Sequence, residues 1–268
     1  MFSITAILSM LLIGLITGIS TGLTGASGVS IVVPLLTLFL SFSVHSAIGT
    51  SLVVDVVASL AVVYTYYRHG NIELRSGIWV LLGSVVGAQL GSVIASNLPE
   101  TGLGIGFGIG MVLMGIVIWR RSKKAIPENT PTGPEYPSKP DRIQIAKAAL
   151  IGLGIGLLTG IMGAGGGMMI LFALIFILKF PLHKAIGTST LIMAVTAFSG
   201  AVGYAMHAEI NVFAGIIVGL GAIVGGLLSA KLANTFSEHR LARVAGSFFV
   251  VLGIVMTVIL VSGNLVLT

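Results

Sequence analysis

The sequence contains no cysteine and very little charge. Without cysteine there can be no disulfide bond, no thiolate chemistry and no cysteine-ligated metal. Only 8% of the 268 residues are charged, whereas soluble domains carry about a quarter. Hydrophobic residues make up 56% of the chain, which is more apolar surface than a soluble core could bury. The composition therefore predicts a membrane protein.

Long apolar runs decide the fold class. Residues 4–23, for example, contain no charged side chain. A transmembrane β-barrel would show short segments of alternating hydrophobicity, so continuous runs predict an all-α polytopic membrane protein. The N-terminus lacks the basic region of a signal peptide, so we expect the first run to be retained. The ten runs are 4–23, 26–41, 46–67, 76–96, 101–119, 143–162, 165–180, 185–206, 210–230 and 241–262.

A polar segment divides these runs into two groups of five. Residues 120–142 contain five prolines together with lysine, glutamate and asparagine, a composition that cannot pack a core. We therefore expect a first transmembrane repeat at 1–119, an exposed linker at 120–142 and a second repeat at 143–268.

The second half repeats the first at an offset of 138 residues. Residues 42–51 (FSVHSAIGTS) match residues 180–189 (FPLHKAIGTS) at seven of ten positions. The glycine-rich segments 21–28 and 159–167 align in the same register. Shared apolar composition alone would not hold one register over so much of the chain, so the pattern indicates a duplication.

The basic residues predict how the two copies are inserted. With the linker in the cytoplasm, all fourteen Lys and Arg fall in cytoplasmic loops, at 68–75, 120–147, 179–184 and 231–243. Each basic loop of one copy aligns with a non-basic loop of the other, which predicts inverted repeats in the cell membrane with both termini outside. This topology also explains the net charge of +6 without nucleic acid. The first two segments of each repeat could span fully or form a re-entrant pair, and the sidedness is the same either way.

The two glycine-rich breaks are the first candidate site. Helices that restart after them would present free N–H groups and positive dipole ends, which suit an anion near the bilayer midplane. The alternative is that these glycines only allow close helix packing. The candidate residues are Gly25, Ser27, Gly28, Gly163, Gly165, Gly166 and Gly167.

The hydroxyls of the repeated AIGTS motif are the second candidate set. Thr50, Ser51, Thr188, Ser189 and Thr190 lie near the start of their apolar runs. They could bind an oxyanion, or they could hydrogen-bond carbonyls of their own helices. We include them as substrate-binding candidates.

Asp55 is the only charged residue among the first 67 and lies near the predicted midplane. A carboxylate at that depth is costly and is by default a functional candidate. Its repeat partner is Met193, so the second half has no equivalent carboxyl group. Asp55 could couple transport to a proton or another cation, or it could be a neutral, hydrogen-bonded structural acid. Weaker coupling candidates are His45 and His183, and secondary lining candidates are Gln89, Tyr66 and Tyr204.

With the glycine-rich breaks and the duplicated AIGTS motif, the chain resembles the TauE/SafE family, also called TSUP. The resemblance covers both halves; the first break departs from the second at Ser27 and Val29, where the second has Gly165 and Gly167. It implies secondary transport of sulfite, sulfoacetate, taurine or similar organosulfonates, usually as export. The expected partners are a small anion, the lipid bilayer and protons; both a monomer and a homo-oligomer stay open.

Other function classes have less support. The sequence has no Walker loop, no HExxH and no dinucleotide fingerprint, so no ATPase, zinc protease or nicotinamide enzyme is indicated, and no metal or cofactor is expected. A passive anion channel remains an alternative. An intramembrane serine protease is a weaker alternative. Residues 25–28 read GASG, which resembles a GxSG motif, but the second copy has Gly165 in place of Ser27.

Overall fold

The structure is a computed structural model that describes residues 3–95, 116, 142–162, 166–177, 180–207, 209–248, 250, 251 and 254. In these ranges the chain is almost entirely helical and has no strand, which confirms the all-α prediction. Residues 1–98 and 131–234 form one compact unit, and residues 99–130 and 235–268 form a second. In the second unit residues 238–248 are helical; the predicted run 101–119 lies outside the described residues except for 116.

In the described residues, each of the other predicted runs in the first unit contains a helix. The sequence did not indicate the short π-helix that follows α7. The elements are α1 (Ile4–Thr24), α2 (Val29–Leu40), α3 (Val44–Arg68), α4 (Leu74–Ala95), α6 (Arg142–Met162), α7 (Gly166–Phe172), the π-helix η1 (Ala173–Ile177), α8 (Leu182–Met206) and α9 (Val212–Thr235).

Several of these helices are long enough to cross a bilayer. Among the described residues, four are both long and apolar enough: Ile4–Thr24, His45–Arg68, Leu182–Met206 and Val212–Thr235. By contrast α2 has 12 residues and so covers only about 18 Å at helical rise, well short of the hydrocarbon thickness of about 30 Å. The chain is therefore a multi-pass membrane protein in which α2 does not span by itself.

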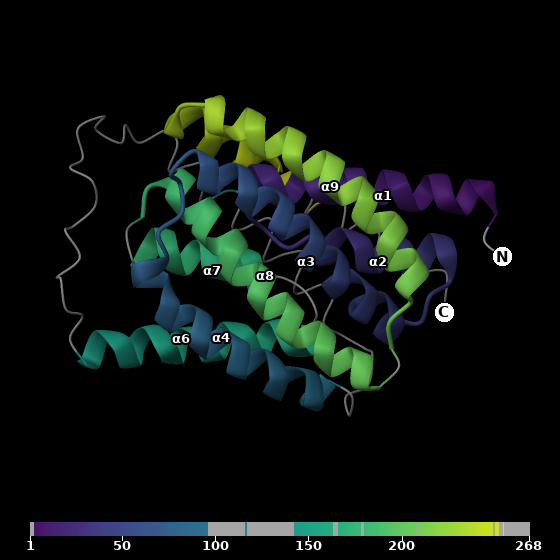
Figure 1. The fold of residues 1–268 in the computed structure, drawn as a ribbon, viewed down its shortest axis with the longest axis horizontal. Helices are drawn as coiled ribbons and strands as arrows, with labels where there is room; N and C mark the ends of the chain where they lie inside the picture. The colour runs from purple at the N-terminus through teal and green to yellow at the C-terminus, as the bar shows by residue number, and fades with distance from the viewer. Residues whose placement is uncertain are drawn as a thin grey trace. The chain divides into compact units, whose positions relative to one another are not determined.

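Glycines hold the helices of the first unit in two close pairs. Figure 1 shows α1 beside α9 along one edge and α4 beside α6 along the other, with α3 and α8 between them. A methyl group added to Gly18 of α1 would lie 2.1 Å from the carbonyl oxygen of Ala222 in α9. One added to Gly156 of α6 would lie 2.0 Å from that of Ser84 in α4. Both pairs are in backbone contact that only glycine permits.

These two contacts are equivalent in the two halves. Gly156 is the repeat partner of Gly18, and Ala222 is the repeat partner of Ser84, each 138 residues later. The next pair of contacts along the helices, made by Gly14 with Val218 and by Gly152 with Val80, repeats in the same way. The offset read from the sequence thus recurs in the packing.

The repeat-related helices α3 and α8 run antiparallel. A methyl group on Gly49, near the start of α3, would lie 2.1 Å from the carbonyl oxygen of Glu209, just after the end of α8. Reciprocally, one on Gly187, near the start of α8, would lie 2.1 Å from that of Asn71, just after the end of α3. The two contacts are reciprocal, and they set α3 and α8 in opposite directions.

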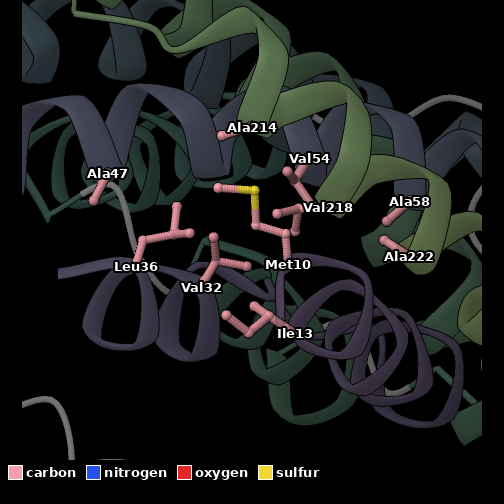
Figure 2. Close-up of a cluster of buried hydrophobic side chains, with 10 residues drawn as sticks. All are labelled: Met10, Ile13, Val32, Leu36, Ala47, Val54, Ala58, Ala214, Val218 and Ala222. Carbon is pink, nitrogen blue, oxygen red and sulfur yellow. The ribbon is translucent and has the colours of Figure 1, made fainter. Parts of the chain in front are cut away.

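Helices α1 and α2 form a tight hairpin. The methyl of Thr17 in α1 abuts Gly28 immediately before α2, and further along the two helices Met10 and Ile13 meet Val32 and Leu36. Figure 2 shows this core, to which α3 adds Ala47, Val54 and Ala58 and α9 adds Ala214, Val218 and Ala222. Because α2 packs along α3, the C-terminal end of α2 lies near the start of α3. The N-terminal end of α2, with the break before it, therefore lies beside the middle of α3.

Candidate functional site

The break between α1 and α2 is a turn of four buried residues. Gly25 ends α1 with φ 65° and donates its N–H to the carbonyl oxygen of Thr21 over 2.8 Å. That left-handed conformation favours glycine. The Thr24 hydroxyl accepts the N–H of Ala26 over 3.2 Å, and α2 then begins at Val29.

Asp55 lies against this turn from the middle of α3. Its side chain is only 2% exposed. The Ser27 hydroxyl donates to Oδ2 of Asp55, and the Gly28 N–H donates to Oδ1 over 2.9 Å. The first N–H groups of a helix have no partner within the helix and attract negative charge, so the carboxylate takes the place of an external anion at the start of α2. The sequence singled out all three residues but did not bring them together.

The other half of the chain reaches the same turn through α7 and α8. A methyl group on Gly167 of α7 would lie 2.7 Å from the Gly25 carbonyl oxygen and 2.8 Å from the Ser27 nitrogen. The Ser189 hydroxyl of α8 would lie 2.7 Å from a methyl group on Gly25. Gly25, Ser27, Gly28, Asp55, Gly167 and Ser189 thus form one buried group. Gly163 and Gly165 lie outside the described residues, and Gly166 begins α7.

Two threonines of the AIGTS motifs cap helices of the opposite half. The Thr50 hydroxyl accepts the N–H of Asn211 over 3.0 Å, at the start of α9. The Thr188 hydroxyl accepts the N–H of Glu73 over 2.9 Å, at the start of α4. These are equivalent bonds at the 138-residue offset. The two threonines therefore lie against the N-terminal ends of α9 and α4. In the sequence Thr50 precedes Asp55, and Thr188 precedes its repeat partner Met193, by five residues.

The remaining motif hydroxyls bond to their own helices. Ser51 donates to the carbonyl oxygen of Ile48 over 2.7 Å, while Ser189 and Thr190 donate to that of Ile186 over 3.0 and 2.7 Å. This is the intrahelical alternative that the sequence left open. Of the three, Ser189 is the one in contact with the α1–α2 turn.

The two histidines lie at the starts of α3 and α8. His45 is in the first turn of α3, ten residues or about 15 Å along the helix from Asp55. His183 is in the first turn of α8, with Nε2 3.1 Å from the carbonyl oxygen of Ala233.

The secondary candidates make helix-to-helix contacts. Tyr66 is fully buried and donates its hydroxyl to the carbonyl oxygen of Gly22 over 3.0 Å, near the end of α1. Tyr204 is also buried, and its hydroxyl has no partner in the described part of the chain. Gln89 of α4 donates to the Ser199 hydroxyl of α8 over 3.0 Å.

Three further buried hydroxyls on α1 and α3 were missed by the sequence analysis. Thr17, Ser20 and Ser59 are fully buried, and their oxygens have no hydrogen-bond partner among the described residues. Ser59 follows Asp55 by one helical turn, and Thr17 touches Gly28. We use the name Asp55 cluster for five buried polar residues of the α1–α2 hairpin and of α3, none of which has a polar counterpart in the other half: Thr17, Ser20, Ser27, Asp55 and Ser59.

Position-by-position comparison of the halves would have found them. The repeat partners of the Asp55 cluster are Ile155, Leu158, Gly165, Met193 and Ala197, none with a polar side chain. A second set, the α4–α8 cluster, takes its polar residues from both halves, and each of them again has an apolar repeat partner. It consists of Ser84, Gln89, Thr196 and Ser199, and its repeat partners are Ala222, Leu227, Ala58 and Ala61.

The long apolar helices, the interrupted hairpin and a buried charged group define the class as a polytopic membrane protein with a polar site inside its bundle. Comparison with known proteins gives the family. The model of the sulfite exporter TauE/SafE family matches residues 10–256, and the chain belongs to this family. The resemblance seen in the sequence is thereby confirmed.

Curated relatives carry transporter names. The chain is 29% identical over 229 residues to the probable membrane transporter protein YdhB of Bacillus subtilis, covering 84% of this chain and 89% of that one. It is 29% identical over 245 residues to a probable membrane transporter protein of Xylella fastidiosa, covering 90% and 91%. The B. subtilis protein YunE, named likewise, is 24% identical over 258 residues, covering 91% and 94%. No solved structure matches the chain.

Proposed function

We propose that this chain is a secondary transporter of small sulfur-containing oxyanions such as sulfite, sulfoacetate or taurine. The observation that carries the proposal is the α1–α2 turn. It provides the Ser27 hydroxyl and the Gly28 N–H as donors deep in the bundle, where an interrupted membrane helix suits an anion. The substrate class itself rests on membership in the TauE/SafE family.

Alternating access would use the contact between the two halves at this turn. Gly25 and Ser27 belong to the first half, while Gly167 and Ser189 belong to the second. Movement of one half against the other would open or close the site, as in inverted-repeat transporters. It would also have to shift the glycine contacts of α1 with α9 and of α4 with α6, because these contacts join the same two halves. In this proposal α1 and α2 form a re-entrant pair, since α2 is too short to span.

The proposed membrane arrangement follows the charges. The protein lies in the cell membrane with the linker 120–142 in the cytoplasm and both termini outside, surrounded by lipid. Asp55 is the proposed coupling residue, because it is buried in contact with the donors of the site and has no acidic counterpart in the other half. A proton is the proposed coupling ion.

Flux through reconstituted protein tests the function. Proteoliposomes are loaded with sulfite, sulfoacetate or taurine, and the efflux of each substrate is measured. The controls are protein-free liposomes with the same load and proteoliposomes loaded with an unrelated anion. We expect saturable, protein-dependent flux of at least one of these substrates. Flux that grows linearly with concentration would indicate a channel, and a lack of protein-dependent flux for the whole panel would reject the proposal.

A further inference from the structure

The donors that would bind a substrate at the α2 N-terminus already have an acceptor within the protein. Asp55 Oδ1 accepts the Gly28 N–H over 2.9 Å, and Oδ2 accepts the Ser27 hydroxyl. Ser27 Oγ in turn accepts the N–H of Val29 over 3.2 Å. A substrate oxyanion needs these same donors. It cannot use them while the carboxylate holds them, and a second negative charge beside an ionised Asp55 in a buried site would be strongly unfavourable.

The surroundings of Asp55 offer more hydrogen-bonding capacity than the carboxylate uses. Thr17, which touches Gly28, and Ser59, one turn from Asp55, are both fully buried, and neither hydroxyl has a partner among the described residues. Buried hydroxyls without partners are rare. They can serve as donors to a larger oxyanion or can accept from a protonated carboxyl group, so the site has the means to bind more than the Asp55 carboxylate.

No other charge near Asp55 would balance a bound anion. Helices α1 and α2, which pack against α3 there, contain no Asp, Glu, Lys, Arg or His. On α8 the titratable residues are His183 and Lys184 in its first turn and Tyr204 near its end, and on α9 the only one is Lys231 in its last turns. The described part of α7 has none. Among the described residues that border the turn, Asp55 is thus the only acidic or basic side chain.

We propose that the Asp55 carboxylate is an internal ligand for the anion site, and that the substrate anion replaces it when Asp55 takes up a proton. The proton binds to a carboxyl oxygen, the neutral side chain releases Ser27 and Gly28, and an oxygen of the anion accepts from both. The site carries one negative charge before and after the exchange. This inference rests on the proposed function and gives it a mechanism, in which a proton and a monovalent anion are bound together.

The direct test is proton uptake on anion binding by the purified full-length protein. The probe is an alkanesulfonate such as methanesulfonate, because its charge does not change across the working pH range. It is added in weakly buffered solution while pH is recorded, and bound anion is measured calorimetrically in parallel. We expect about one proton taken up for each anion bound, since one carboxylate is neutralised.

Variants separate Asp55 from other sources of protons. Asp55→Asn keeps an oxygen that can accept from Gly28 but has no charge to neutralise, so it should bind the sulfonate without proton uptake and with the same affinity at acidic and alkaline pH. Ser27→Ala removes one donor and should weaken binding about threefold to tenfold. Ser84→Ala, which alters a buried hydroxyl of the α4–α8 cluster, should behave as wild type.

The outcomes distinguish this inference from the proposed function. Saturable sulfonate binding by the wild type without proton uptake, or with a requirement for sodium in its place, would overturn the inference while leaving an anion transporter. Absence of both binding and flux for all the anions tested would overturn both. Because proton uptake is measured on the wild type, the result stands even if Asp55→Asn fails to fold.

Discussion

The Asp55 cluster is buried inside the helical bundle, and so is the α4–α8 cluster apart from the half-buried Gln89. The two clusters differ in how completely their hydrogen bonds are met. In the α4–α8 cluster Ser84 and Thr196 share a 2.7 Å bond, and Gln89 and Ser199 share one of 3.0 Å. In the Asp55 cluster three hydroxyls have no partner among the described residues. Polar groups inside a membrane are costly, so the satisfied set fits a structural role and the unsatisfied set fits a binding site.

Neither cluster is repeated, although the scaffold around both of them is. The glycine contacts of α1 with α9 recur between α6 and α4, and the cap by Thr50 recurs at Thr188. The two halves therefore share backbone packing and helix caps, where any change would disturb the fold. The two halves differ in polarity at the positions of the two clusters, where one half has a polar side chain and the other has a residue such as alanine, leucine or methionine.

The largest effect is expected where the scaffold is symmetric. Gly18→Leu and Gly156→Leu each force a side chain into a carbonyl group of the neighbouring helix, and each should lower the free energy of unfolding by about 3 kcal/mol. Thermal unfolding in detergent measures both. Gly154→Ala is the matched control in the same helix, because a methyl group there meets nothing within 4 Å. A large loss in one variant and none in the other would break the proposed equivalence.

The next prediction concerns the asymmetric site. Asp55→Asn should retain substrate flux but lose its response to an imposed pH gradient, because the residue can no longer exchange a proton. Met193→Leu, at the equivalent position of the other half, nearly conserves volume and should keep that response. The measurement is efflux from proteoliposomes with and without a pH gradient. A response that persists in Asp55→Asn would exclude Asp55 as the coupling residue.

A smaller and equal effect is expected at the two helix caps. Thr50→Val and Thr188→Val each leave a backbone N–H at the start of α9 or α4 without its acceptor, at a cost of about 1 kcal/mol in unfolding free energy. Serine in either position keeps the hydroxyl and should restore most of the loss. Equal stability of the valine and serine variants would show that these caps contribute nothing.

The smallest effect is expected within the α4–α8 cluster. A double-mutant cycle of Ser84→Ala and Thr196→Ala should give a coupling energy of about 0.6 kcal/mol, the usual size for a hydrogen bond between membrane helices. Flux should be unchanged in all three variants. If flux falls in these variants as it does in variants of the Asp55 cluster, the distinction between a structural and a functional cluster fails.

Much of the fold could be predicted because it depends on local hydrophobicity. Runs without charge marked the helices to within a few residues, and glycine density marked the break before α2. The π-helix η1 carries no comparable signal. The helix-capping role of Thr50 and Thr188 also could not be read from the sequence, because it depends on which helix ends lie opposite them in three dimensions.

The candidate site was predictable in part. Asp55 was identified by its depth, and Ser27 and Gly28 by the glycine-rich break, but their direct contact required the hairpin of α1 and α2. Thr17, Ser20 and Ser59 were missed because serine and threonine in membrane helices usually bond their own backbone. Only their lack of such a bond in the described structure distinguishes them.

The central claim, that one scaffold is present twice in opposite orientations, can be tested by cysteine labelling, since the chain has no cysteine of its own. Single cysteines are placed at two exposed repeat-related pairs, Ser43 with Pro181 and His69 with His207, and intact cells are treated with a membrane-impermeant maleimide. The account predicts labelling of the Ser43 and His207 positions from outside, and of the Pro181 and His69 positions only after the membrane is opened. Labelling of both members of a pair from the same side would contradict it.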